Sequence, residues 1–243
     1  MKYRRIVLKL SGEALAGTSG HGIDSSRAGG ICDEVAALSR GGSEIVLVVG
    51  GGNIFRGATG TGGGIGRAAG DMIGMLATLI NALALKEFLQ ARSTPTSVFS
   101  AVHVEKAAPF FVREKALEAL GRGDVVIVAC GTGNPYFTTD TAAALRCAEL
   151  GAEVLLKGTK VDGVYDRDPV TNPHAKRFDR LDYDEAIGRN LRVMDITALS
   201  FCRENAIPII VFDLTEEGNL GRCVSGEPVG SIVSKEGFSN GGH

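Results

Sequence analysis

The sequence lacks the marks of several common protein classes. Tryptophan is absent, and no Gly-Lys dipeptide occurs in the 243 residues, which excludes a Walker A P-loop because that motif contains Gly-Lys. None of the five cysteines forms a Cys-x-x-Cys pair, so we expect reduced, mostly buried thiols rather than disulfides or zinc ligands. The net charge of -2 and the lack of a basic run argue against nucleic acid as a partner.

Long apolar segments are also missing. The run from Ile6 to Leu10 is too short, and with Lys9 too charged, to be the core of a signal peptide. The longest apolar-rich stretch, residues 72–85, contains Asn81 and is shorter than a membrane span. We therefore expect a soluble, cytoplasmic protein that makes no membrane contact.

What the sequence does have is glycine, at 34 residues, and a hydrophobic fraction of 44%, enough to bury a full core. Glycine without a strict period or a proline bias indicates many tight loops rather than disorder or collagen. With no internal repeat and no long linker, we predict one domain over residues 1–243. It has two lobes, about 1–150 and 151–235, and a flexible tail at 236–243.

The predicted strands are mostly unbroken runs of Val, Ile and Leu that alternate with helical stretches, as is typical of strands buried on both faces. We therefore predict an α/β fold, a three-layer α/β/α sandwich around a mostly parallel sheet. Asp24 and Asp195 are expected to cap two of the helices. The predicted strands are 5–10, 44–49, 96–100, 125–130, 153–157, 207–212 and 230–234, and the helices 25–40, 67–91, 112–120, 139–150, 183–189, 195–204 and 218–225.

The most informative segment is residues 131–140, Gly-Thr-Gly-Asn-Pro-Tyr-Phe-Thr-Thr-Asp, which joins a buried strand to a helix. In open α/β sheets, ligands bind at the carboxyl ends of strands, often against a helix N-terminus. Glycines, a proline bend and hydroxyls at that place predict a site for a phosphorylated polar ligand. The alternative is an ordinary strand-to-helix connection with Asn-Pro as its turn.

Other strand ends carry groups suited to phosphate. Lys9 ends the first strand before Ser-Gly and can direct a cation at a phosphate, or it is an edge lysine that reaches solvent. The second strand ends in Gly50-Gly51-Gly52, which allows close backbone approach to a ligand, or forms a purely structural turn. Arg56 follows with a guanidinium suited to phosphate oxygens.

Two further segments offer contacts for a sugar or a base. Asp71 is an acceptor for sugar hydroxyls, or simply an acid favoured by the helix dipole in a first turn. Residues 157–169 begin with Lys157 and include Tyr165, whose flat ring suits a nucleoside, although a solvated charged loop is the plainer interpretation. Together, these strand ends suit phosphoryl transfer, which needs alignment and charge neutralisation more than covalent participation.

At this point the chain resembles the bacterial UMP kinases of the amino-acid-kinase fold family, over nearly its whole length. The family signature alone leaves aspartate, glutamate, acetylglutamate or carbamate open as acceptor, whereas the 131–140 loop and the Gly-Asp-x-x-Gly-Met segment resemble the UMP branch. The matching segments are 9–15, 50–57, 70–71 with 74–78, 131–140, 157–164 and 193–195.

The resemblance implies transfer of the γ-phosphoryl group of ATP to UMP, with Mg²⁺, in pyrimidine nucleotide biosynthesis. Residues 1–150 would form the UMP-binding lobe and 151–235 the ATP-binding lobe. It also implies a homohexamer activated by GTP and inhibited by UTP. The implied ATP-binding residues are Lys9, Leu10, Ser11, Gly12, Gly52, Arg56, Thr159, Tyr165 and Asp168. The implied UMP-binding residues are Gly51, Asp71, Thr132, Gly133, Asn134, Pro135, Tyr136, Phe137, Thr138 and Thr139.

The acceptor phosphate has its second pKa near ~6 and is mostly a dianion at neutral pH, so no general base is needed. What must be overcome is repulsion between two anions. We assign Lys9 and Lys157 to charge neutralisation, Arg56 to bridging the two phosphates, and Asp140 to orienting a lysine or the water shell of Mg²⁺. No protein metal site is predicted.

Two other classes remain. One is a kinase of the same fold that acts on a carboxylate or carbamate, and the other is a non-catalytic nucleotide- or oxyanion-binding protein. The tract Gly57–Gly66 is richer in glycine than the resemblance leads us to expect, so its conformation and any effector contact near it stay open.

Overall fold

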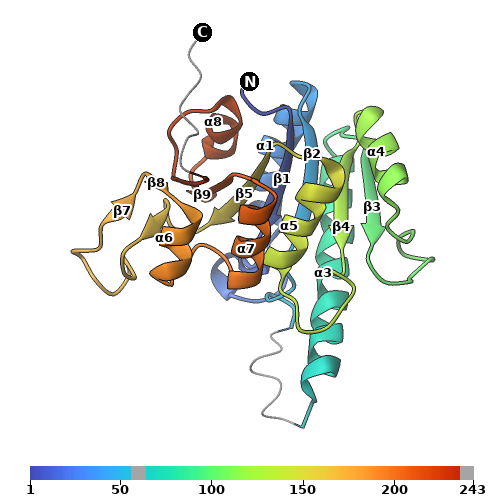
Figure 1. The fold of residues 1–243 in the computed structure, drawn as a ribbon. Helices are drawn as coiled ribbons and strands as arrows, with labels where there is room; N and C mark the ends of the chain where they lie inside the picture. The colour runs from blue at the N-terminus through green and yellow to red at the C-terminus, as the bar shows by residue number, and fades with distance from the viewer. Residues whose placement is uncertain (56–63, 236–243) are drawn as a thin grey trace.

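A computed structural model describes residues 1–55 and 64–235, and its centre is an eight-stranded sheet in the order β3-β4-β2-β1-β5-β9-β10-β8 (Figure 1). All pairs are parallel except β9 with β10. The predicted fold class is confirmed. The strands of this sheet are β1 (Arg5–Leu10), β2 (Glu44–Val49), β3 (Thr96–Ser100), β4 (Val125–Ala129), β5 (Val154–Thr159), β8 (Arg180–Leu181), β9 (Ile209–Asp213) and β10 (Ser231–Val233).

Helices cover both faces of the sheet (Figure 1). The helices α1 (Ser25–Arg40), α3 (Arg67–Gln90) and α8 (Asn219–Ser225) cover one face, and α4 (Arg113–Gly121), α5 (Thr139–Leu150), α6 (Tyr183–Gly188) and α7 (Ile196–Glu204) the other. Within β1, Ile6 and Leu8 join the first core and Val7 joins the second, since successive side chains point to opposite faces. Two buried faces explain why these strands lack polar alternation.

The predicted elements are found at ends that differ by no more than two residues. Three strands of two residues each were not predicted: β8, and the pair β6 (Val164–Tyr165) and β7 (Arg177–Phe178). They contain no hydrophobic run and are defined by their pairing alone. All five cysteines are buried and free, as expected. The lobe boundary near residue 151 stays a prediction, and the 236–243 tail lies outside the described residues.

Helix starts follow the predicted caps. The side chain of Asp24 accepts a hydrogen bond from the Arg27 N–H at 2.9 Å, and that of Asp195 accepts one from the Ala198 N–H at 2.9 Å. Each aspartate thereby satisfies an amide that a helix start leaves without an intrahelical partner. Both predicted N-caps are confirmed.

Helix α3 corrects one expectation about membranes. The helix was predicted at 67–91, but only residues 72–85 were weighed as a possible span, and the whole helix of 24 residues is long and apolar enough to cross a membrane by length and composition alone. It packs against α1, β3 and β4, as a core helix of this composition does. Its first turns extend past the sheet (Figure 1).

A buried pair of amides fixes α3 to the glycine turn after β2. Asn53 and Asn81 are 3% and 0% exposed and exchange hydrogen bonds of 3.0 and 2.7 Å through their side chains. Asn53 also donates to the Gly22 carbonyl and Asn81 to the Gly50 carbonyl, each at 2.7 Å. Every group in this network has a partner, as a buried amide requires.

We predict that Asn81→Ala lowers the free energy of unfolding by about 2 to 3 kcal/mol, because it removes the side-chain donor to two buried oxygens, the Gly50 carbonyl and Asn53 Oδ1. Denaturant unfolding measures the change. Asn205→Ala is the control, because that exposed amide bonds only the Phe201 carbonyl, at 2.9 Å, and should cost less than about 1 kcal/mol. Equal losses in the two variants would contradict the assigned role of the pair.

Candidate active site

The order of the strands indicates at which edge of the sheet a ligand site is expected. After β1, the chain builds β2, β3 and β4 on one side of it, and then returns to place β5 on the other side. The carboxyl ends of strands at such a reversal are where open α/β sheets bind their ligands. The loops that follow β1, β2, β4 and β5 are the four that the sequence analysis singled out.

Two lysines lie side by side at this reversal. Lys9 and Lys157 are register partners on the parallel strands β1 and β5. Their neighbours two residues earlier, Val7 and Leu155, belong to the core beneath α5, so both lysines point to that face. The alternative of Lys9 as an edge lysine that reaches solvent is wrong, because β1 is central and its side chain is 12% exposed.

Asp140, in the first turn of α5, pairs with both lysines. Its Oδ1 lies 2.7 Å from Lys9 Nζ, and its Oδ2 accepts a hydrogen bond of 2.9 Å from Lys157 Nζ. Burial opposes the charge of Asp140, but the two ammonium groups outweigh it and hold the pKa of Asp140 below its usual value. For Lys157, loss of water lowers the pKa below the usual value despite the attraction of Asp140.

The first two glycine loops pack tightly against each other. A Cβ added to Gly12 would lie 2.8 Å from the Gly52 nitrogen and 2.9 Å from the Gly50 oxygen, so only glycine fits there. Ser11 caps the short helix that follows, its hydroxyl 3.3 Å from the Glu13 N–H. The Leu10 side chain belongs to the core, and its carbonyl accepts a hydrogen bond of 2.8 Å from the Gly50 N–H. Arg56 lies outside the described residues.

The loop after β4 has an unusual backbone. Cys130, Gly131, Gly133 and Tyr136 all have positive φ, and a Cβ at Gly133 would lie 2.5 Å from the Ala101 carbonyl. The φ of Tyr136 is 73°, which is rare for a bulky residue. A loop held in such a conformation is shaped before any ligand arrives.

This loop closes a cavity of about 240 Å³, here called the acceptor cavity. Five of the residues implied to bind UMP line it: Gly51, Asp71, Phe137, Thr138 and Thr139. The other five, Thr132 to Tyr136, do not line it, and Thr132 and Asn134 instead bond each other. Of the residues that line it, Met75 and Thr78 stand one helical turn or more beyond Asp71. The lining residues that the sequence analysis missed are Phe55, Gly70, Gly74, Met75, Thr78 and Gly131.

Asp71 contacts this loop directly. Its Oδ2 accepts a hydrogen bond of 2.8 Å from the Tyr136 N–H, and Arg67 Nε donates to both of its oxygens at 3.0 and 2.8 Å. Partial burial works against the charged form, but these donors hold the pKa of Asp71 below its usual value. Asp71 is therefore more than a first-turn acid, since it joins α3 to the loop.

Asp195 was predicted as a helix cap and has a second role. Besides capping α7, it accepts hydrogen bonds from the hydroxyls of Thr138 and Thr141 in α5 and its cap. Two residues earlier, the Val193 carbonyl accepts a hydrogen bond of 2.5 Å from Lys157 Nζ. The segment before α7 thus contacts both Lys157 and the end of the 131–140 loop, here called the acceptor loop. In the sequence, residues 193–195, Val-Met-Asp, had indicated this segment as one of those that carry the family resemblance.

A second cavity, of about 530 Å³ and here called the nucleotide cavity, lies beyond β5. It includes Tyr165, whose hydroxyl donates to Asp162 at 2.5 Å, and also Lys160, Arg177, Asp213 and Arg222, which the sequence analysis missed. Lys160 also lines a neighbouring cavity of about 580 Å³ together with Thr159. Asp168 lines neither, and its carboxylate accepts from the Val170 N–H at 2.9 Å.

Comparisons with known proteins agree with this geometry. Residues 4–213 match the model of the Amino acid kinase family. The chain is 50% identical over 234 residues to the chloroplastic uridylate kinase PUMPKIN of Arabidopsis thaliana, covering 96% of this chain and 69% of that protein.

Solved structures of UMP kinases also match. That of Bacillus anthracis superposes with a TM-score of 0.94 at 35% identity, covering 97% of this chain and 98% of the other. That of Ureaplasma parvum superposes with a TM-score of 0.91 at 36% identity, covering 97% and 100%. The resemblance noted in the sequence is thereby confirmed, and the chain belongs to the amino acid kinase family.

Proposed function

We propose that this protein is a UMP kinase that transfers the γ-phosphoryl group of ATP to UMP. The observation that carries the proposal is the pairing of Lys9 and Lys157 on one carboxylate, Asp140, beside a cavity closed by the 131–140 loop. The relatives reported above, which bear the names uridylate kinase and UMP kinase, support the choice of acceptor. A carboxylate or carbamate kinase would need a different acceptor loop.

The lysines would act on charge rather than on protons. Donor and acceptor phosphates repel each other as they approach, and two ammonium groups at the meeting point offset that repulsion. Asp140 keeps both ammonium groups in place and is held ionised by them. We assign no general base, because the acceptor phosphate is already mostly a dianion at neutral pH.

Mg²⁺ would be held mainly by the nucleotide phosphates. Within residues 1–55 and 64–235 no three His, Cys, Asp or Glu side chains gather as a metal-binding group. Asp140 is already paired with both lysines, so any contact that it makes with the ion would run through a water molecule, in keeping with the habit of Mg²⁺ to retain waters. The bound ion would neutralise phosphate charge.

For the donor, we propose that the phosphates lie along Lys9, Ser11, Gly12 and Gly52, and that Tyr165 and the nucleotide cavity take the adenosine part. Thr159 and Asp168 stay assigned to ATP by the resemblance alone. Arg56 keeps its proposed bridging role.

We also propose a homohexamer with GTP as activator and UTP as inhibitor, as the resemblance implies. A row of apolar side chains on α3, 37 to 50% exposed, is available for assembly: Met72, Ile73, Leu76 and Ile80.

The proposal is tested by an ADP-release assay with ATP, Mg²⁺ and a panel of UMP, CMP, dUMP, aspartate and acetylglutamate, with and without GTP. Turnover confined to UMP is the expected result. Turnover with an amino acid would show that the loop was misinterpreted. ATP binding without turnover of any acceptor would favour a binding protein.

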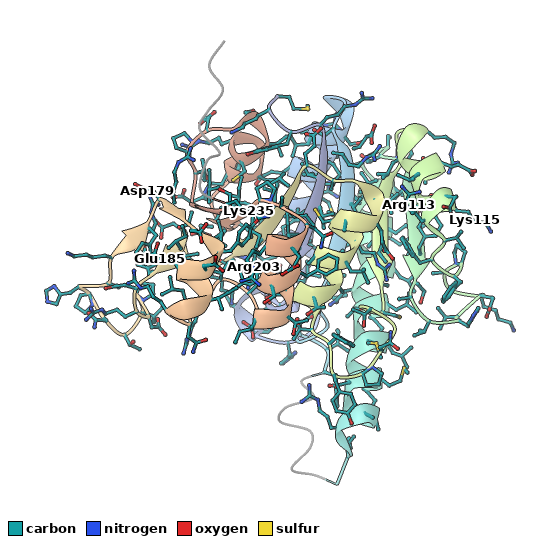
Figure 2. All side chains as sticks on the ribbon, viewed as in Figure 1. Arg113, Lys115, Asp179, Glu185, Arg203 and Lys235 are labelled. Atoms are coloured by element: carbon teal, nitrogen blue, oxygen red, sulfur yellow. The ribbon has the colours of Figure 1, made fainter. Side chains whose placement is uncertain are left out.

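We predict that Lys9→Met, which keeps the aliphatic stem and removes the charge, lowers kcat at least about 10²-fold at saturating substrates. Lys115→Ala is the control, because that lysine lies on the outside of α4 (Figure 2) and should leave kcat unchanged. Near-normal turnover by Lys9→Met would remove Lys9 from the mechanism.

The pH dependence provides a separate prediction. Because burial lowers the pKa of Lys157, its charge is lost as pH rises through a value below the usual 10.5, and kcat should fall there. Lys157→Arg keeps its charge at alkaline pH, so any activity it retains should not show this fall. At the acid end, KM for UMP should rise as pH falls below about 6, where the acceptor phosphate gains a proton. A kcat that stays constant up to pH 10.5 while the fold persists would contradict the assignment of Lys157.

A further inference from the structure

Tyr136 adopts a conformation that its own packing does not explain. A left-handed backbone is strained for a bulky residue, and such strain persists only where the surroundings impose it. Tyr136 is 67% exposed, so burial of the ring is not what holds it. Its backbone N–H and its ring both contact residues of α3.

Arg67, the first residue of α3, contacts both partners of that junction. It donates through Nε to both oxygens of Asp71, and its guanidinium carbon lies 5.5 Å from the centre of the Tyr136 ring. Asp71 in turn accepts from the Tyr136 N–H at 2.8 Å. Arg67, Asp71 and Tyr136, here called the Arg67 clamp, therefore each contact the other two.

The clamp lies at the acceptor cavity. Asp71 lines that cavity, as do Phe137 and Thr138, which directly follow Tyr136 in the chain. A carboxylate has about four lone-pair positions, and among the described residues Arg67 and Tyr136 use three of them at Asp71. Counted over these residues, Asp71 has one position left for a further donor, and the clamp fixes where that acceptor stands.

We propose that Arg67 is a positioning residue for the acceptor: it holds Asp71 and the Tyr136 backbone in the geometry in which the cavity binds the nucleoside monophosphate. This rests on the proposed function of the cavity. A loop shaped in advance spares the ligand the cost of ordering it, so the contribution of Arg67 falls on acceptor affinity. The chemical step depends on the lysine pair and should not change.

The plainer alternative is an exposed ion pair between residues four apart on a helix, which stabilises the helix only slightly and has no effect on binding. The chain contains a matched control for it. Arg189 pairs with Glu185 four residues earlier, at 2.7 Å, and lies 4.7 Å over the Phe178 ring, yet it lines none of the cavities described above.

The experiment compares Arg67→Ala, Arg67→Lys and Arg189→Ala in steady-state kinetics, and in calorimetric binding of UMP without ATP. Arg67→Ala should raise KM and Kd for UMP about fivefold or more, the worth of about one hydrogen bond, with kcat and KM for ATP within about twofold. Arg67→Lys should recover part of the loss, and Arg189→Ala should match the parent. An unchanged KM for UMP in Arg67→Ala, or a fall in kcat alone, overturns the proposal.

A double-substitution cycle tests whether Arg67 acts through Asp71. In the Asp71→Asn background, Arg67→Ala should weaken UMP binding by less than about twofold, because the group that it positions is already changed. Multiplicative losses would show that the two residues act independently and overturn the clamp. If the parent protein neither binds nor turns over UMP, the proposed function fails first, and this outcome is seen before any variant is compared.

Discussion

The site depends on one arrangement of charge: a buried carboxylate that two buried ammonium groups share. Two lysines on adjacent strands repel each other and lose water, which a protein tolerates only if a counter-charge is at hand. Asp140 supplies it from the first turn of α5, at 2.7 Å from Lys9 and 2.9 Å from Lys157. The register of β1 with β5 places the two lysines, and the position of α5 with the turn before it places Asp140. All of these features must therefore form together for the triad of Lys9, Lys157 and Asp140 to exist.

The rest of the architecture holds the loops around that triad. Asp195 joins the start of α7 to the cap of α5, and the Asn53–Asn81 pair joins the glycine turn to α3. From within α5, Arg146 stacks 4.1 Å over the Phe111 ring and reaches the Gly131 carbonyl at 3.5 Å, at the base of the acceptor loop. Loops held from several elements gain precision that a free loop lacks, which phosphoryl transfer requires because it depends on alignment.

Much of this could be predicted because it is local. Apolar runs gave the long strands, Asp24 and Asp195 gave helix starts, and the strand-end lysines with the 131–140 loop indicated the site. What the sequence does not contain is the pairing that brings distant residues together. Strands β6, β7 and β8 have no periodicity to detect, Arg177 enters the nucleotide cavity only through such a pair, and the contact of Asp71 with Tyr136 spans 65 residues. The expectation about a membrane span was wrong for a different reason, because it weighed residues 72–85 alone and not the whole predicted helix.

The charge of the triad also limits what it can do alone. Two ammonium groups and one carboxylate leave a single positive charge, while donor and acceptor phosphates bring several negative charges. A site of larger positive charge would bind the phosphates more tightly in the ground state and the transition state alike, which adds little to turnover. Because Asp140 offsets one of the two lysine charges, the site would attract the phosphates only modestly in the ground state. The rest of the phosphate charge would be neutralised by groups that bind with the nucleotide or by the loop after β2. Under the proposed function, Asp140 would therefore set the balance between binding the phosphates and transferring the phosphoryl group.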